Sequence, residues 1–172
     1  MATKIEFLHL EIKHFLNFVD KLPGAATWCK DTVEHLLKQG FIQVSTVFEY
    51  AIANVGGHTV VSLDAADIDD GTPGGSDAKL ATVRTSSRGK KYSAPVSSIS
   101  GKTGSLRVQI YERKQDKFYY FLIPHDAYKH IPKTSNIEIP FELDGTPRRV
   151  PRGRYIQNWW NYEVATFDEM CK

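Results

Sequence analysis

The sequence predicts an α/β fold in which N-terminal helices pack on a mixed sheet of four or five strands. Apolar residues in the first third of the chain recur at helical spacing, whereas residues beyond 57 form short runs with the alternation of strands. Segments rich in Gly and Pro separate these runs. With 172 residues, of which 41% are hydrophobic, the chain can bury the core of a single domain.

Three helices are expected in the N-terminal part. The first covers residues 5–19, where one apolar stripe of helical period is formed by Ile5, Leu8, Ile12, Phe15, Leu16 and Val19. A second helix follows through residues 31–38 and stops at a glycine. The third runs from Ser45 or Thr46 to Asn54, before a pair of glycines.

Five strands and one short helix are expected after these helices. The strands are His58–Leu63, Asp77–Val83, Ser105–Glu112, Lys117–Ile123 and Ile137–Leu143. The third alternates apolar and polar residues, which predicts one buried face, and the fourth is apolar and aromatic throughout, which predicts two. Pro140 lacks a backbone donor and so places the last strand at an edge. The short helix is expected to open at Pro124.

Several features favour a cytoplasmic protein that does not contact membranes. No segment approaches the roughly 18–20 apolar residues of a membrane span, and the N-terminus lacks the shape of a cleavable signal. Cys29 and Cys171 lie far apart without the spacing of a metal site, so free thiols in a reducing compartment are expected.

Charge is distributed unevenly along the chain, although the formal net charge is only +2. Residues 1–78 carry 5 Lys and Arg against 11 Asp and Glu, whereas residues 79–154 carry 16 against 6. A positive half beside an acidic cluster fits a protein that holds a polyanion on one surface and acts on it at another.

The acidic cluster surrounds the second expected strand. Five carboxylates gather there, and they are Asp64, Asp67, Asp69, Asp70 and Asp77. Side chains alternate along a strand, so Asp77 and Lys79 should share one face while Ala78 points to the other. A loop that closes symmetrically about Pro73 would place Asp67 opposite Lys79 and Asp69 opposite Asp77. A slip of one residue would instead place Ile68 opposite Asp77.

Carboxylates on one strand face repel each other unless a cation joins them, and Asp is otherwise depleted in strands. A magnesium ion held by two or three oxygens would resolve the repulsion, and Lys79 could then orient or help to deprotonate a water. Asp67, Asp69 and Asp70 all remain candidates for the first ligand. The alternative is an acidic surface hairpin, such as a calcium loop, with Lys79 as an ordinary solvated cation.

This pattern resembles the PD-(D/E)XK nuclease superfamily, in which an acid is followed across a hairpin by Asp/Glu-x-Lys. The matching residues are Asp67, then Asp77 and Lys79 with Ala78 in the x position, although no proline precedes Asp67. The resemblance covers roughly residues 45–122 and implies a restriction-endonuclease-like core. It also implies that Asp67, Asp77 and the Ala78 carbonyl bind Mg²⁺, for which Mn²⁺ can substitute.

In many such enzymes a Glu from the preceding helix adds a metal ligand, and Glu49 is the acid that matches this role. The alternative for Glu49 is a reciprocal cap, because Thr46 and Glu49 have the spacing of a capping box.

Two basic segments are candidate contacts to nucleic acid. The first follows the acidic strand and contributes Arg84, Ser87, Arg88, Lys90 and Lys91, and the second contributes Arg148, Arg149, Arg152 and Arg154. The first could instead be a connector. The adjacent Trp159 and Trp160 could stack on a base, although a pair of tryptophans more often caps a core.

Together these observations predict a magnesium-dependent endonuclease that cuts double-stranded DNA as a homodimer. Residues 1–172 would form one domain, with a helical part over 1–57, a sheet core over 58–143 and a basic, aromatic segment over 144–172. One alternative is a non-catalytic nucleic-acid-binding module that keeps the fold. Another is a metal-binding regulatory domain.

Overall fold

The computed structural model describes residues 44–61, 66–86, 89, 91–150 and 157–172. Their main element is a six-stranded sheet of order β1-β2-β3-β6-β7-β9. Its strands are β1 (Thr59–Val60), β2 (Ile68–Asp69), β3 (Ser76–Thr82), β6 (Ser105–Glu112), β7 (Lys117–Ile123) and β9 (Glu163–Val164).

A second, three-stranded sheet has the order β4-β5-β8, with strands β4 (Arg84–Thr85), β5 (Tyr92–Val96) and β8 (Ile137–Phe141). The described helices are α3 (Val44–Gly56), α4 (His125–Tyr128), the 3₁₀ helix η2 (Trp159–Tyr162) and α5 (Phe167–Cys171). Among the described strands, β3 and β6 pair in parallel and every other pair is antiparallel. The chain between β3 and β6 carries β4 and β5, so it forms part of the second sheet on its way back.

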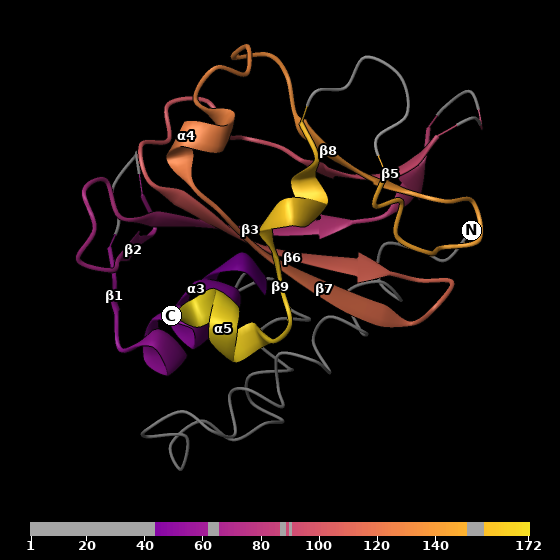
Figure 1. Cartoon of the computed structure of the whole chain (residues 1–172). Coiled ribbons are helices and arrows are strands. Elements are labelled where there is room, and N and C mark those ends of the chain that lie inside the picture. The colour runs from indigo at the N-terminus through magenta and orange to yellow at the C-terminus, as the bar shows by residue number, and fades with distance from the viewer. Residues whose placement is uncertain (1–43, 62–65, 87–88, 90, 151–156) are drawn as a thin grey trace.

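The six-stranded sheet has a core on each face. Helices α3 and α5 lie side by side against one face, where Phe48, Ile52, Ile68 and Met170 are fully buried (Figure 1). The second sheet, α4 and η2 cover the other face, which holds the larger core. Alternation along β3 serves both cores, because Ala78 packs with the helices and Ala81 packs with the second sheet.

The α/β class and the mixed sheet are confirmed, whereas the expected number of four or five strands is wrong. The strands that were not expected are β2, β4, β5 and β9, and three of them have only two residues each, which is too short to give a periodic pattern in the sequence. Helix α3 is confirmed, and the helices expected over 5–19 and 31–38 lie outside the described residues. The described helices are spread along the chain and are not gathered before the sheet. Helix α5, at the C-terminal end of the described residues, packs on α3.

The expected strands of the sheet core differ from the structure mainly in their burial. β6 is buried on both faces from Leu106 onward, because α5 contacts the face that was expected to meet solvent. β7 instead alternates between buried and partly buried side chains. In the second sheet, β8 pairs with β5 alone among the described strands, which confirms the edge position that Pro140 predicts.

The tryptophan pair belongs to the larger core. Trp160 is 4% exposed, stacks edge-on against Tyr119 and Phe141, and donates its indole N–H to the Pro140 carbonyl at 3.0 Å. Packing of this kind confirms the cap over the core and leaves neither ring face open to a base. No described helix is long and apolar enough to cross a membrane.

Two loops meet closely at the start of β3 and β6. The Ser105 amide donates to the Gly75 carbonyl at 3.2 Å, and the Tyr128 hydroxyl donates to the Gly104 carbonyl. A Cβ on Gly104 would lie 1.8 Å from the Gly75 oxygen, so only glycine fits. This contact fixes the loop of residues 97–104 against the hairpin that carries the acidic residues.

We expect Gly104→Ala to lower the free energy of unfolding by about 3 kcal/mol or more, because the two backbones would have to separate. Gly71→Ala is the matched control. Gly71 has a φ of 77°, but a methyl group at this position would meet nothing within 4 Å, so its cost is about 1 kcal/mol of backbone strain. Urea unfolding measures the free energy of unfolding of both variants. Equal losses would show that the close contact between Gly104 and Gly75 does not contribute to stability.

Candidate functional site

The hairpin between β2 and β3 places Asp67 directly beside Asp77. Ile68 pairs with Ser76, and the Asp67 amide donates to the Ser76 carbonyl at 3.0 Å, so the next position along puts Asp67 opposite Asp77. The turn is thus centred on Thr72, and the two registers expected from a turn about Pro73 or from a one-residue slip are wrong. A shift of two residues keeps every side chain on its expected face.

Asp77 is the most deeply buried acid of this cluster, with 1% of its side chain exposed. Its Oδ2 lies 2.5 Å from Lys79 Nζ, and its Oδ1 lies 2.5 Å from Lys102 Nζ. Apart from these ion pairs, neither oxygen has a hydrogen-bond partner among the described residues. The expected alternation is confirmed, since Asp77 and Lys79 share a face while Ala78 packs in the helix-covered core.

Asp67 completes the pair of carboxylates. Its Oδ2 accepts a hydrogen bond from the Ala78 amide at 3.0 Å, which holds the side chain against β3. Burial, followed by the hydrogen bond that a protonated Asp67 could donate to Asp77 and by the negative charge of Asp77, raises the pKa of Asp67. A carboxyl group whose pKa is raised by a neighbouring carboxylate is typical of a cation site before its cation arrives.

Glu49 reaches the same site from helix α3. Burial, followed by the charges of Asp67 and Asp77, raises its pKa to about 7 against the opposing effect of the lysines. The helix already includes Val44, so Thr46 lies inside it and the capping-box interpretation is wrong. Glu49 therefore lies within α3, away from its first turn, and is close enough to the acidic cluster for the charges of Asp67 and Asp77 to raise its pKa.

The remaining acids of the hairpin have structural partners. The exposed Asp69 accepts the Gly71 amide at 3.1 Å within the turn. Asp70 accepts the Thr72 amide and hydroxyl and pairs with Arg107 at 3.0 Å, and these bonds outweigh burial and lower its pKa to about 2. Asp67 is thus the first acid that fits a site with Asp77, and Asp64 lies outside the described residues.

Two charged residues near the hairpin were missed by sequence reasoning. Arg107 is 3% exposed and also bonds to Ser76 Oγ and to the Met170 carbonyl, so it joins the acidic turn to α5. Lys102 belongs to the loop of residues 97–104. Its position follows from the parallel pairing of β3 with β6, which brings that loop beside Ser76, and no local pattern in the sequence reveals it.

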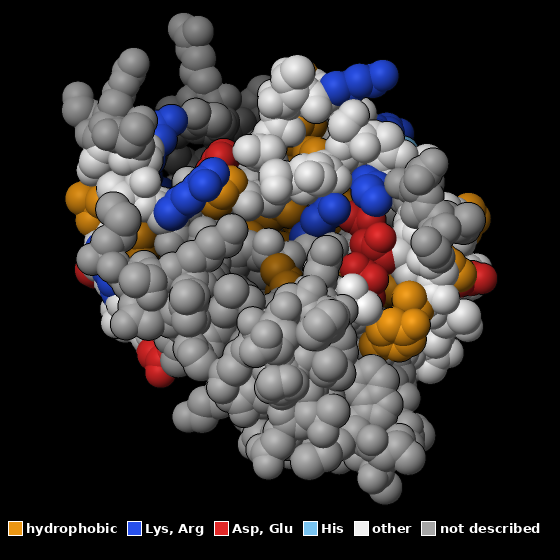
Figure 2. All heavy atoms as spheres, turned by 180° about the vertical axis from the view of Figure 1, so that it is seen from behind, with side chains coloured by type: hydrophobic (Ala, Val, Ile, Leu, Met, Phe, Trp, Pro, Cys, Tyr) orange, Lys and Arg blue, Asp and Glu red, His pale blue; other side chains and the backbone are white. Residues whose placement is uncertain are grey.

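The site as a whole holds three carboxyl groups and two lysines. On the face shown in Figure 2, acidic side chains lie directly against basic ones. Within the described ranges, no three His, Cys, Asp or Glu side chains are already arranged as a metal cluster. The residue types nevertheless suit Mg²⁺, because it prefers carboxylate oxygens as ligands, and both Asp77 oxygens are held here by lysine ammonium groups.

The expected contacts to nucleic acid are only partly described. Arg84 is exposed on β4. Lys91 is also exposed, and its carbonyl accepts a hydrogen bond from the Ser86 amide in the hairpin between β4 and β5. The positions Ser87, Arg88, Lys90, Arg152 and Arg154 lie outside the described residues.

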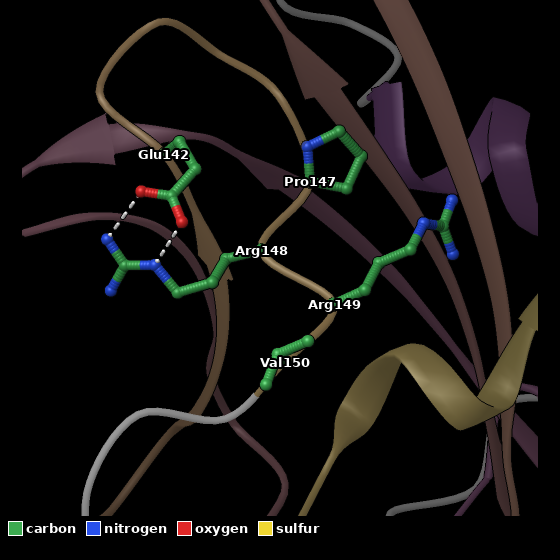
Figure 3. Close-up of a pocket in the computed structure, with 5 residues that line it drawn as sticks. All are labelled: Glu142, Pro147, Arg148, Arg149 and Val150. Carbon is green, nitrogen blue, oxygen red and sulfur yellow. Dashed lines mark hydrogen bonds and ion pairs between the residues drawn. The ribbon is translucent and has the colours of Figure 1, made fainter.

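The two described arginines of the C-terminal segment have partners in the chain. Arg148 makes a two-bond ion pair with Glu142, at 2.9 Å and 3.0 Å, beside a shallow hollow (Figure 3). Arg149 extends away from Glu142 on the other side of the chain, pairs with Glu163 and lies over the Trp160 ring. Their charges are therefore partly neutralised within the protein.

Comparison with known proteins does not assign the chain to a group: no family model, curated protein or solved structure matches it. The interpretation of the site accordingly depends on its geometry and on the short motif.

We expect the Glu49 carboxyl to make stability fall as the pH rises. Its pKa is raised on folding, so its contribution is complete below about pH 4.5 and is lost as the pH passes about 7. In EDTA at pH 8, the free energy of unfolding of Glu49→Gln should therefore exceed that of the parent by roughly 1 kcal/mol, after allowance for solvent screening. At pH 5 the two proteins should unfold with the same free energy.

Glu138→Gln is the control, because Glu138 is exposed and a glutamine can still accept from Ser93. A gain from Glu49→Gln that is the same at both pH values would contradict the placement of Glu49 among the acids.

Proposed function

We propose that the protein is a magnesium-dependent endonuclease of the PD-(D/E)XK type that hydrolyses phosphodiester bonds in DNA. One observation supports this most strongly. Asp67, Asp77 and Lys79 meet on one face of a hairpin, and Glu49 comes to them from the helix that precedes it. These are the residue types, in the chain order, that the motif requires.

Each of these residues has a distinct task in the proposed reaction. Asp67 and Asp77 would hold the cation, with Glu49 and the Ala78 carbonyl completing the protein's share of its oxygen ligands. The cation would supply Lewis-acid stabilisation of the phosphate. Lys79, held 2.5 Å from Asp77, would orient the attacking water or help to remove its proton.

The surrounding fold is compatible with a restriction-endonuclease-like core. Helix α3 leads into the antiparallel strands β1, β2 and β3, and β6 then adds in parallel beside β3. We propose that these elements form that core. The connection from β3 to β6 passes through the small second sheet, which covers the larger hydrophobic core.

The substrate we propose is double-stranded DNA. The basic half of the sequence supplies the cations that phosphates attract. Arg84 begins β4 and is separated from the end of β3 only by Val83. Because the described part of the chain holds one such site, we propose that a two-fold homodimer cuts both strands.

A non-catalytic nucleic-acid-binding module is the second candidate. It is favoured by the ion pairs of Asp77, which satisfy both carboxylate oxygens without any metal. The two candidates differ in whether the acids are needed for an activity.

Cleavage of long duplex DNA with and without Mg²⁺ separates the candidates. We expect Asp77→Asn to abolish magnesium-dependent cleavage and Lys79→Met to slow it by about 10²–10⁴-fold, while both variants still bind DNA. Asp126→Asn is the control, because Asp126 forms an exposed ion pair with Lys129. Intact DNA with the parent protein would favour the binding module, and unchanged cleavage by Asp77→Asn would reject the site.

Salt dependence tests the nucleic-acid surface. If Arg84 contacts a phosphate, Arg84→Ala should reduce the slope of log K against log salt by about 1. Arg148→Ala should reduce it less, because Arg148 is already paired with Glu142. An affinity of the parent protein that does not change with salt would contradict both nucleic-acid candidates.

A further inference from the structure

Lys102 covers the most buried carboxylate of the site. Asp77 is 1% exposed, whereas Lys102 is 14% and Lys79 is 16% exposed, so both lysines lie nearer the surface than the carboxylate that they hold. On the opposite side of the carboxylate, Lys79 holds Oδ2. Asp77 thus has one ammonium group on each oxygen, and these oxygens have no other hydrogen-bond donor among the described residues.

The two lysines are attached to the fold in different ways. Lys79 belongs to β3 itself, two positions from Asp77 on the same face of the strand, so the strand backbone holds it beside that carboxylate. Lys102 comes from the loop of residues 97–104, whose backbone is fixed at Gly104. Its four-carbon side chain can rotate away and uncover Oδ1 while the loop stays in place.

Formal charges explain why such a rotation would be favourable. Glu49, Asp67 and Asp77 carry three negative charges when all are ionised, and the two lysines supply two positive charges. A divalent cation in place of Lys102 would, together with Lys79, balance all three carboxylates. A hard dication also prefers several oxygen ligands, which this cluster offers and a single ammonium cannot use.

We propose that Lys102 is the resident counter-ion of Asp77, which competes with a divalent cation for Oδ1 and leaves that oxygen when the cation binds. This inference rests on the proposed metal-dependent function and adds a residue outside the motif. It assigns Lys102 the role of a competing positive charge, which lowers the affinity of the site for metal in the absence of DNA.

Calorimetric titration of Mn²⁺ into the metal-free, full-length protein without DNA tests the competition. We expect Lys102→Met to bind Mn²⁺ at least about tenfold more tightly than the parent, because the competing charge is gone. Lys102→Arg keeps the charge and should bind like the parent. Lys129→Met is the matched control, since it removes a lysine from the exposed pair with Asp126. Adding Asp77→Asn to Lys102→Met should abolish the gain.

A second measurement covers the consequences for folding. In EDTA, Lys102→Met should melt at a lower temperature than the parent, and Mn²⁺ should raise its melting temperature by more than it raises the parent's. If Lys102→Met does not give the circular dichroism spectrum of the parent, Lys102→Gln replaces it, because glutamine can still donate to Oδ1 without a charge.

Equal or weaker Mn²⁺ binding by the folded Lys102 variant would overturn the inference. If that binding still depends on Asp77, the metal site survives and only the role of Lys102 is wrong. If no variant binds Mn²⁺ at all, the inference and the metal-dependent function fail together.

Discussion

Burial of the Asp77 carboxylate is the constraint on which the rest of this site depends. A charge with 1% exposure is costly unless cations or donors surround it, and here the cations beside it among the described residues are Lys79 and Lys102. One lysine comes from the same strand and the other from a loop that the parallel β3–β6 pairing brings near. The tight contact of Gly104 with Gly75 sets the position of that loop.

Strand β3 separates packing from chemistry by simple alternation. Ala78 and Leu80 face helices α3 and α5, so one side of the strand is apolar. Asp77 and Lys79 face the other way, near the start of the strand. Arg107 neutralises Asp70 on the helix-covered side, so the second acid of the turn serves the fold. The acids of one short hairpin thus have separate tasks.

Local patterns in the sequence predicted the parts of the site that lie close together in the chain. Asp77 and Lys79 are two residues apart on a strand, and their shared face follows from geometry alone. Glu49 was ambiguous, because a capping box and a ligand have the same local pattern, and only its position inside α3 distinguishes them. Lys102 could not be predicted, since its contact with Asp77 depends on a pairing between strands almost thirty residues apart.

Registers and burial were harder to predict for similar reasons. The turn before β3 is centred on Thr72, where backbone bonds close it, and the composition of the loop pointed to Pro73. The alternating pattern of β6 indicated one face in contact with solvent. Helix α5 covers that face, and the charge of Arg107 is neutralised there by Asp70. Two-residue strands leave no pattern at all. Long-range packing therefore decided the features that local patterns left open.

Crystals soaked in Mn²⁺ and measured at the manganese edge would test the central claim most directly. The account predicts an anomalous peak between the Asp67 and Asp77 carboxylates, with Lys79 still beside the site. Asp77 still held by both lysines, with no peak at these carboxylates, would contradict it.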